Sequence, residues 1–127
     1  MTKNNQRLQE ILGASITEYT PNAIKFTAIS LHQLEQLLAE GFTTATSYFN
    51  AAPTTAQFIE FGKRCTDIGA VATFDGVAFI GEDGDTRMDT ITVVGVQDLD
   101  FVGEFVKFTR ECDDIEVSSQ LLFAWWH

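Results

Sequence analysis

Apolar residues recur at helical spacing in several segments of the chain, each bounded by a residue that caps or ends a helix. The predicted helices cover residues 4–12, 31–40, 53–66 and 99–112. Ser30 and Gln33 have the spacing of a capping box at the start of the second helix. Asp98 is a suitable N-cap for the last. The pattern therefore predicts one short and three main helices.

Alternating apolar and polar residues predict strands between these helices. The predicted strands cover residues 15–20, 22–29, 43–49, 70–74, 77–80, 88–96 and 115–126. Asp75-Gly76, between two of them, is the strongest hairpin signal in the chain. We therefore expect a tight turn at this dipeptide, and a polar turn at 81–87 before the next strand.

The last predicted strand, 115–126, carries apolar residues on both faces. One face is expected to join the core; it consists of Ile115, Val117, Leu121, Phe123 and Trp125. Leu122, Ala124 and Trp126 then point to the other side. That side is either covered by a helix or loop of the same chain or meets another chain, as in a homodimer that pairs C-terminal strands. Trp126 is therefore a candidate interface residue.

The order of these elements predicts one α+β domain over residues 1–127. We expect a mixed, largely antiparallel sheet of five to six strands with about three main helices packed on it. Helices flanked by strands at both ends also suggest a variant of the ferredoxin-like arrangement. The 45% hydrophobic content and the eleven Phe residues are sufficient for a self-supporting core.

The net charge of −10 lies entirely in the second half of the chain. Residues 1–66 contain five basic and five acidic side chains, whereas residues 67–127 contain three basic and thirteen acidic ones. Binding to nucleic-acid phosphates requires clustered Lys and Arg, so direct nucleic-acid binding is disfavoured. A basic protein partner is compatible with this charge.

The cellular compartment is inferred from what the sequence lacks. The N-terminal segment is polar and does not resemble an export signal, and no apolar run has the length of about 20 residues that a membrane helix needs. Cys65 and Cys112 are too few for a disulfide framework and do not have zinc-site spacing. We therefore expect a cytoplasmic protein that does not bind a membrane.

Acidic residues cluster in two connecting segments, and both are candidate partner-binding sites. The candidate residues are Glu82, Asp83, Asp85, Asp113, Asp114 and Glu116, together with Trp126. The alternative is that these acidic residues form helix caps and solvated turns and only keep a Phe-rich domain soluble, without binding a partner. The binding hypothesis depends on whether the two segments meet on one surface.

The first acidic segment also raises the question of a metal site. Asp83, Asp85 and Asp89 are weak candidates, because carboxylates bind Ca²⁺ or Mg²⁺. The spacing does not match an EF-hand loop, and Asp and Gly are also typical of a tight strand connection. We therefore expect a structural turn, no metal and no cofactor.

No residue has the neighbours that catalysis requires. His32 lies off the apolar stripe of its helix and His127 is the last residue, so both are expected in solvent. Cys65 and Cys112 are placed at helix C-terminal ends, where the helix dipole opposes thiolate formation. An enzyme is therefore not indicated.

The sequence favours a small acidic interaction protein, an inhibitor, immunity or regulatory protein that binds a basic partner without catalysis. The alternative is a small-ligand- or metal-binding α+β domain, or an enzyme, that uses the acidic loop Glu82–Asp89. No family resemblance decides between them.

Overall fold

A six-stranded antiparallel sheet with helices on one face makes up the computed structural model, which describes residues 5–81 and 84–127. The helices are α1 (Asn5–Leu12), α2 (Leu31–Ala39), α3 (Thr55–Asp67) and α4 (Leu99–Phe108), and a short 3₁₀ turn, Gly13–Ser15, follows α1. The strands are β1 (Ile16–Tyr19), β2 (Ala23–Ser30), β3 (Val71–Phe79), β4 (Thr86–Val94), β5 (Asp114–Val117) and β6 (Leu121–Trp125). Their order across the sheet is β1-β2-β3-β4-β6-β5.

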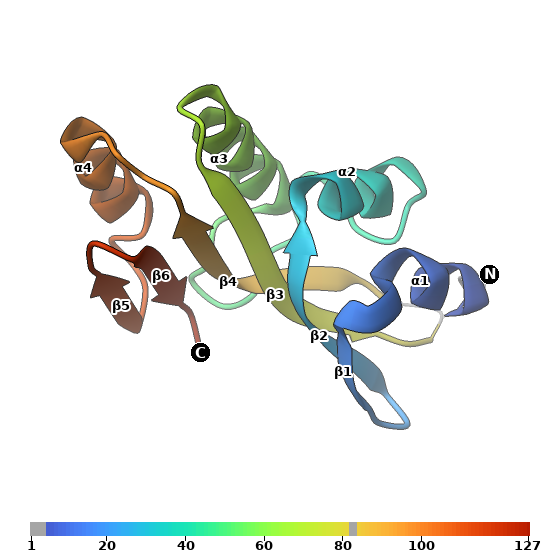
Figure 1. The fold of residues 1–127 in the computed structure, drawn as a ribbon. Helices are drawn as coiled ribbons and strands as arrows, with labels where there is room; N and C mark the ends of the chain where they lie inside the picture. The colour runs from blue at the N-terminus through green and yellow to red at the C-terminus, as the bar shows by residue number, and fades with distance from the viewer. Residues whose placement is uncertain (1–4, 82–83) are drawn as a thin grey trace.

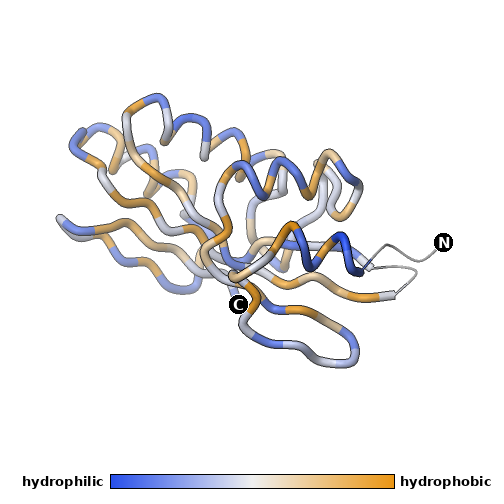
Figure 2. Tube along the Cα trace, turned by 45° about the vertical axis from the view of Figure 1, so that its right-hand side comes forward, coloured by the Kyte–Doolittle hydropathy of each residue, from blue (hydrophilic) through white to orange (hydrophobic). Residues whose placement is uncertain are grey.

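The molecule has two layers. Helices α2, α3 and α4 lie side by side over one face of the sheet, and no described helix covers the other face (Figure 1). The tube in Figure 2 shows hydrophobic and hydrophilic residues alternating along the strands beneath the helices. The core is therefore the layer between sheet and helices, and the opposite sheet face is open to solvent.

The centre of the core is aromatic. Phe58 of α3 makes edge-to-face contacts with Phe74 of β3, at a ring-centroid distance of 5.8 Å, and with Trp126, at 5.6 Å. Phe61 stacks on Phe108 at 4.2 Å and joins α3 to α4. Such pairs add roughly 0.5–1.5 kcal/mol each to the free energy gained by burying apolar area. They hold α3 and α4 against the middle of the sheet.

The starts predicted for α2 and α4 are confirmed, whereas α3 begins at Thr55 rather than at 53. Ser30 and Gln33 form a complete capping box at α2, and Asp98 accepts a hydrogen bond from the Asp100 N–H at α4. A second capping box, between Thr54 and Gln57, starts α3. Each cap satisfies N–H groups that the first helical turn leaves without partners.

The hairpin predicted at Asp75-Gly76 is wrong. Both residues lie inside one continuous strand, β3, and the chain turns later, between Phe79 and Thr86. Gly76 is needed for a different reason: an added Cβ would clash with the carbonyl oxygen of Arg87 on β4. Close approach of two strands, rather than a tight turn, selects glycine at this position.

The strand predicted at 43–49 is also wrong. Residues 40–54 form a long loop, and Thr43 is buried in it with only 2% of its surface exposed. The Thr43 hydroxyl group bonds to Thr55 Oγ1 at 2.9 Å and donates to the Thr86 carbonyl at 2.7 Å. Within the loop the Ser47 hydroxyl group accepts the Thr44 N–H at 3.1 Å, and local side-chain bonds of this kind compete with a regular ladder.

The C-terminal segment is a hairpin of β5 and β6, not one strand. Alternation is interrupted at 118–120, and the predicted face of β6 is reversed. Leu122, Ala124 and Trp126 point to the core, whereas Trp125 is 39% exposed on the open face. Trp126 is 1% exposed and is covered by the chain itself, so it is not available as an interface residue.

The predicted α+β class and the strand number are confirmed, and all neighbouring strands are antiparallel. The ferredoxin-like arrangement joins parallel strands through each helix. Here α2 and α3 connect β2 to β3, which are antiparallel neighbours. The connectivity of the six strands therefore differs from that arrangement, because the sheet is assembled from hairpins.

Candidate functional site

Cross-strand pairing places acidic and aromatic side chains in one row on the open face of the sheet. Asp75 of β3 pairs with Thr90 of β4, which pairs with Trp125 of β6. Trp125 in turn pairs with Asp114 of β5. Residues directly opposite each other point to the same face. Asp89, next to Thr90, adds a third carboxylate to this row.

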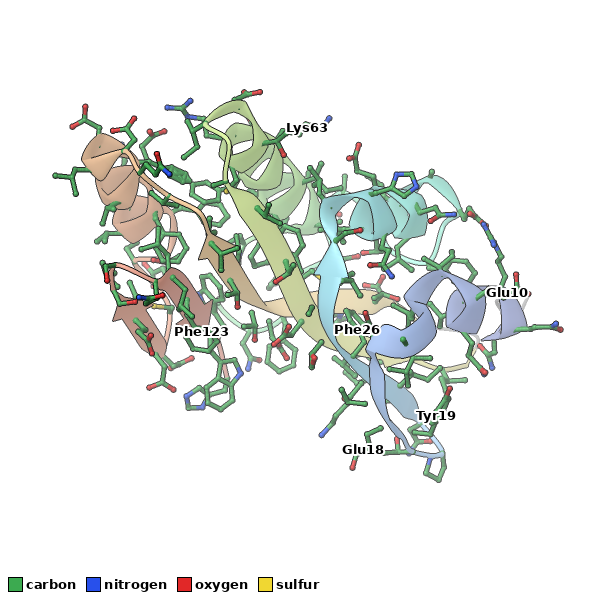
Figure 3. The ribbon with its side chains drawn as sticks, in the orientation of Figure 1. Glu10, Glu18, Tyr19, Phe26, Lys63 and Phe123 are labelled. Carbon is green, nitrogen blue, oxygen red and sulfur yellow. The ribbon has the colours of Figure 1, made fainter. Side chains whose placement is uncertain are left out.

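The next row of the same face contains Glu116 of β5, paired with Phe123 of β6. Figure 3 shows Phe123 on the side of the sheet away from the helix that carries Lys63. We call this surface the acidic sheet face; it is formed by Asp75, Asp89, Asp114, Glu116, Phe123 and Trp125.

Three β-bulges interrupt the neighbouring ladders β1–β2, β2–β3 and β3–β4. Thr17 is an extra residue in β1 and Asp89 is one in β4. In β2, Thr27 and Ala28 are together opposite Asp75. Bulges redirect side chains and are frequent next to binding and active sites. Here the β4 bulge lets Asp89 and Thr90 line the open face together.

The β2 bulge contains a strained backbone. Ala28 has φ of 56°, in the left-handed region that residues with a side chain seldom adopt. Its N–H donates a hydrogen bond of 2.8 Å to Asp75 Oδ1. This hydrogen bond offsets part of the energetic cost of the strained backbone, and it also fixes the position of the Asp75 carboxylate. Strain of this kind concentrates at functional sites.

Partial burial raises the pKa of both central carboxyl groups. For Asp75 the cause is desolvation, opposed by the Ala28 N–H. Desolvation also raises the pKa of Asp89, and the negative charge of Asp75 raises it further. A 2.7 Å hydrogen bond from the Thr90 hydroxyl group acts in the opposite direction and lowers the pKa of Asp89. The positive charge of Lys25 lowers it, although Lys25 also forms an exposed ion pair with Glu18 at 3.3 Å. An additional cation would therefore be favourable here.

An open hollow of about 300 Å³ is lined by both carboxylates and by the aromatic residues Phe123 and Trp125, and Lys25 lines it as well. The Trp125 ring stacks on the His127 ring at 4.1 Å, and His127 Nε2 is 3.2 Å from Asp114 Oδ2. These contacts hold Trp125 in place over the sheet. Carboxylates beside a fixed indole provide both ionic and cation–π attraction for a cation.

The two acidic segments of the sequence meet only in part: Asp89, the last residue of the first segment, shares the acidic sheet face with Asp114 and Glu116 of the second. The end of β3 and the start of β4 lie on the side of α1, whereas β5 is at the far side of the sheet (Figure 1). Asp114 and Glu116 belong to the acidic sheet face. Asp113 lies just before β5, where its carboxylate accepts the His127 N–H at 2.7 Å. Asp85 is instead near Arg87, at 3.4 Å, and Glu82 and Asp83 lie outside the described residues.

The candidate metal ligands are separated in the same way. Asp85 faces Arg87, while Asp89 lines the hollow beside Asp75. Within residues 5–81 and 84–127, no three Asp, Glu, His or Cys side chains come close enough to hold a metal ion. Asp83 lies outside the described residues.

The cysteines lie where thiolate formation is unfavourable. Cys65 is fully buried, and desolvation raises its pKa to about 12. Cys112 is half-buried, and desolvation and the nearby carboxylates Asp113 and Asp114 raise its pKa as well. His32 is exposed on α2, as expected.

Sequence reasoning missed Asp75 and the role of Trp125. Asp75 was assigned to a turn, and Trp125 to the core. The one available signal was Asp75 as the single charged residue of the run 70–80, which a bulged strand explains as well as a hairpin does.

No family model matches the chain, and no curated protein or solved structure is significantly similar to it. None of the helices in the described part of the chain has the length and apolar character to cross a membrane.

Proposed function

We propose that this protein binds a basic segment of another protein on the acidic sheet face, without catalysis. The observation that carries the proposal is the row formed by Asp75, Asp89, Trp125 and Asp114 on a sheet face that no described helix covers. An inhibitor, immunity or regulatory protein of the cytoplasm would act in this way. The free thiols Cys65 and Cys112 are compatible with a reducing compartment.

Electrostatics supports this choice of partner. Desolvation disfavours the ionised forms of Asp75 and Asp89, and a guanidinium or ammonium group placed between them would offset that cost. Charge-assisted hydrogen bonds to such a group are roughly twice as strong as neutral ones. The net charge of −10 would also accelerate the encounter with a basic surface.

Strand pairing between two copies is less favourable than binding a basic partner. β5 is an edge strand, and Ile115 and Val117 are about half exposed on it. Antiparallel pairing of two β5 strands would, however, bring Asp114 and Glu116 of both copies together. Like charges across a ladder are destabilising. A homodimer through the C-terminal hairpin therefore remains the second proposal, to be tested by analytical ultracentrifugation.

The proposal is tested with two variants that each neutralise three carboxylates, one on the acidic sheet face and one elsewhere on the surface. One variant carries Asp75→Asn, Asp89→Asn and Asp114→Asn; the control carries Glu60→Gln, Asp67→Asn and Glu111→Gln. All six residues are described, and the three control residues are exposed and lie outside the acidic sheet face. Both variants have the same net charge, so general attraction to a cation is matched.

The probe is an eight-residue arginine peptide, titrated at low and at high salt and followed by backbone amide chemical shifts. We expect the sheet-face variant to bind about ten-fold more weakly than the control, and shifts of wild-type resonances in β3, β4 and β6. Equal affinities for the two variants, or shifts confined to other elements, would refute the proposal.

A further inference from the structure

The long loop 40–54 between α2 and α3 has a defined conformation without being a helix or strand. Its ends are fixed by the Thr43 hydrogen bonds to Thr55 and to the Thr86 carbonyl. Its middle is fixed because the Thr55 N–H donates to the Ser47 carbonyl at 2.9 Å. Loops of this length without secondary structure are uncommon in compact domains and are often functional.

This loop and the start of β4 border an open polar hollow of about 610 Å³, which we call the loop hollow. Hydroxyl groups of Thr44 and Thr46 and the amide of Asn50 line it from the loop, and Asp85 and Arg87 line it from the strand. The volume is within the range of about 300–1,000 Å³ typical of small-molecule sites. It is separate from the acidic sheet face, whose hollow is lined by a different set of residues.

The two charged residues of the loop hollow neutralise each other. Arg87 Nε lies 3.4 Å from Asp85 Oδ2, and the Arg87 guanidinium also lies 5.7 Å from the centre of the Phe79 ring. Among the described residues that line the hollow, neither a free anion nor a free cation would find an uncompensated opposite charge. The electrostatics of the hollow therefore favours a neutral ligand.

Asp85, which lines the hollow, also carries an acceptor that needs a donor. Asp85 Oδ1 is buried and has no hydrogen-bond partner among the described residues. A buried acceptor left unsatisfied costs about 1–3 kcal/mol, so turning the Asp85 carboxyl group toward a ligand hydroxyl in the hollow would be favourable. The remaining lining groups, hydroxyls and an amide, both donate and accept, as a ligand with several hydroxyl groups requires.

One aromatic ring completes the lining: Tyr48 is 56% exposed and borders the hollow. An exposed ring beside polar groups offers a flat apolar surface for the C–H face of a sugar ring. We propose that the loop hollow binds a neutral polyhydroxylated small molecule, a monosaccharide unit, with Asp85 and Arg87 bonding to its hydroxyls and Tyr48 packing on its ring.

The experiment titrates the isotope-labelled protein with three neutral probes: methyl β-glucopyranoside, methyl α-mannopyranoside and methyl N-acetyl-β-glucosaminide. Sodium acetate and methylammonium chloride serve as charged comparisons. We expect at least one glycoside to produce saturable amide shifts in residues 44–50 and 85–87. Concentrations extend to about 50 mM, above the Kd of about 1 mM of weak ligands.

Two variants identify the contacts. Asp85→Asn is expected to weaken glycoside binding about ten-fold, because it replaces a charged acceptor with a neutral one, and Tyr48→Ala is expected to weaken it as well. Glu60→Gln, on the exposed side of α3, is the matched control and should bind as the wild type does. Amide spectra of the free variants verify that each is folded.

No saturable shift with any of the three glycosides overturns the proposal. Shifts that are unchanged in Asp85→Asn, or that appear with acetate or methylammonium at these residues in place of the glycosides, overturn it too. None of these results bears on the acidic sheet face, because the arginine peptide and the glycosides report on different residues.

Discussion

Replacing Gly76 with Ala is the sharpest test of the strand arrangement. Gly76 lies in the middle of β3, opposite Met88 of β4 and Phe26 of β2. A methyl group at this position would clash with the Arg87 carbonyl oxygen and lie 3.0 Å from the Phe26 ring. Only backbone movement relieves the first clash, because a carbonyl oxygen cannot rotate away independently of its strand.

The expected loss in the free energy of unfolding follows from that backbone movement. The two strands must separate by about 1 Å to restore a normal contact of about 3.5 Å. Overpacking of this kind costs about 1–3 kcal/mol, and stretched ladder hydrogen bonds add to it. We expect a loss of about 3 kcal/mol in the free energy of unfolding, out of a typical total of about 5–15 kcal/mol.

The same substitution, glycine to alanine, should have the opposite effect on stability at an exposed helix position. Gly103 is exposed inside α4, and an added Cβ meets no atom within 4 Å. Ala is the better helix former by about 0.8–1.0 kcal/mol, so Gly103→Ala should stabilise the protein. Urea unfolding measures both variants. With a slope of about 2 kcal/mol/M, Gly76→Ala should lower the midpoint by roughly 1.5 M and Gly103→Ala should raise it by roughly 0.4 M.

A loss of less than about 1 kcal/mol for Gly76→Ala would refute the reasoning, because a clash with backbone atoms cannot be relieved so cheaply. Such a result would indicate that β3 and β4 are not in close contact at this point. Equal effects of the two substitutions would lead to the same conclusion.

Three further predictions concern individual side chains. Trp126→Ala should cost about 3–5 kcal/mol in urea unfolding and Trp125→Ala less than about 1 kcal/mol, because only Trp126 is in the core; similar losses would contradict the assignment of faces. Asp89→Asn should stabilise the protein at pH 7, since burial raises the pKa of this carboxyl and the folded state is penalised when it is ionised. The gain should diminish as the pH falls through the raised pKa and vanish below the ordinary value of 3.8; a gain unchanged at pH 3 would exclude this cause. Cys65 should resist thiol alkylation at pH 8 in the native protein, while the half-buried Cys112 reacts faster; mass spectrometry of the peptides measures both rates.

The elements with strong local signals were predictable. Ser30 with Gln33, and Asp98, identified helix starts because their side chains bond to the nearby backbone whatever surrounds them. The alternation in β2 and the apolar stripes of the helices were sufficient for the fold class. The order of the strands could not be predicted from these local patterns, because the pairing of β2 with β3 joins residues that are distant in the chain.

The candidate site depends on long-range geometry, and the sequence could not show it. Asp75 and Asp114 come from different hairpins and share a row only because of the strand register. Bulges shift that register by one residue and reverse which side chains face the solvent. The acidic segments were recognisable from their charge, but their position in space depends on the strand order, which places Asp89 on the central strand β4 and Asp114 on the edge strand β5.

The strand order has a consequence for the path of folding. The sheet consists of three local hairpins, β1–β2, β3–β4 and β5–β6, joined along two seams. The β2–β3 seam pairs Phe26 with Gly76, 50 positions later in the chain. Hairpins form in about 1–10 μs, whereas distant pairings must first overcome the entropy of closing a long loop. The rate-limiting step should therefore be the joining of preformed hairpins, with α2 and α3 carried in the loop that closes the β2–β3 seam.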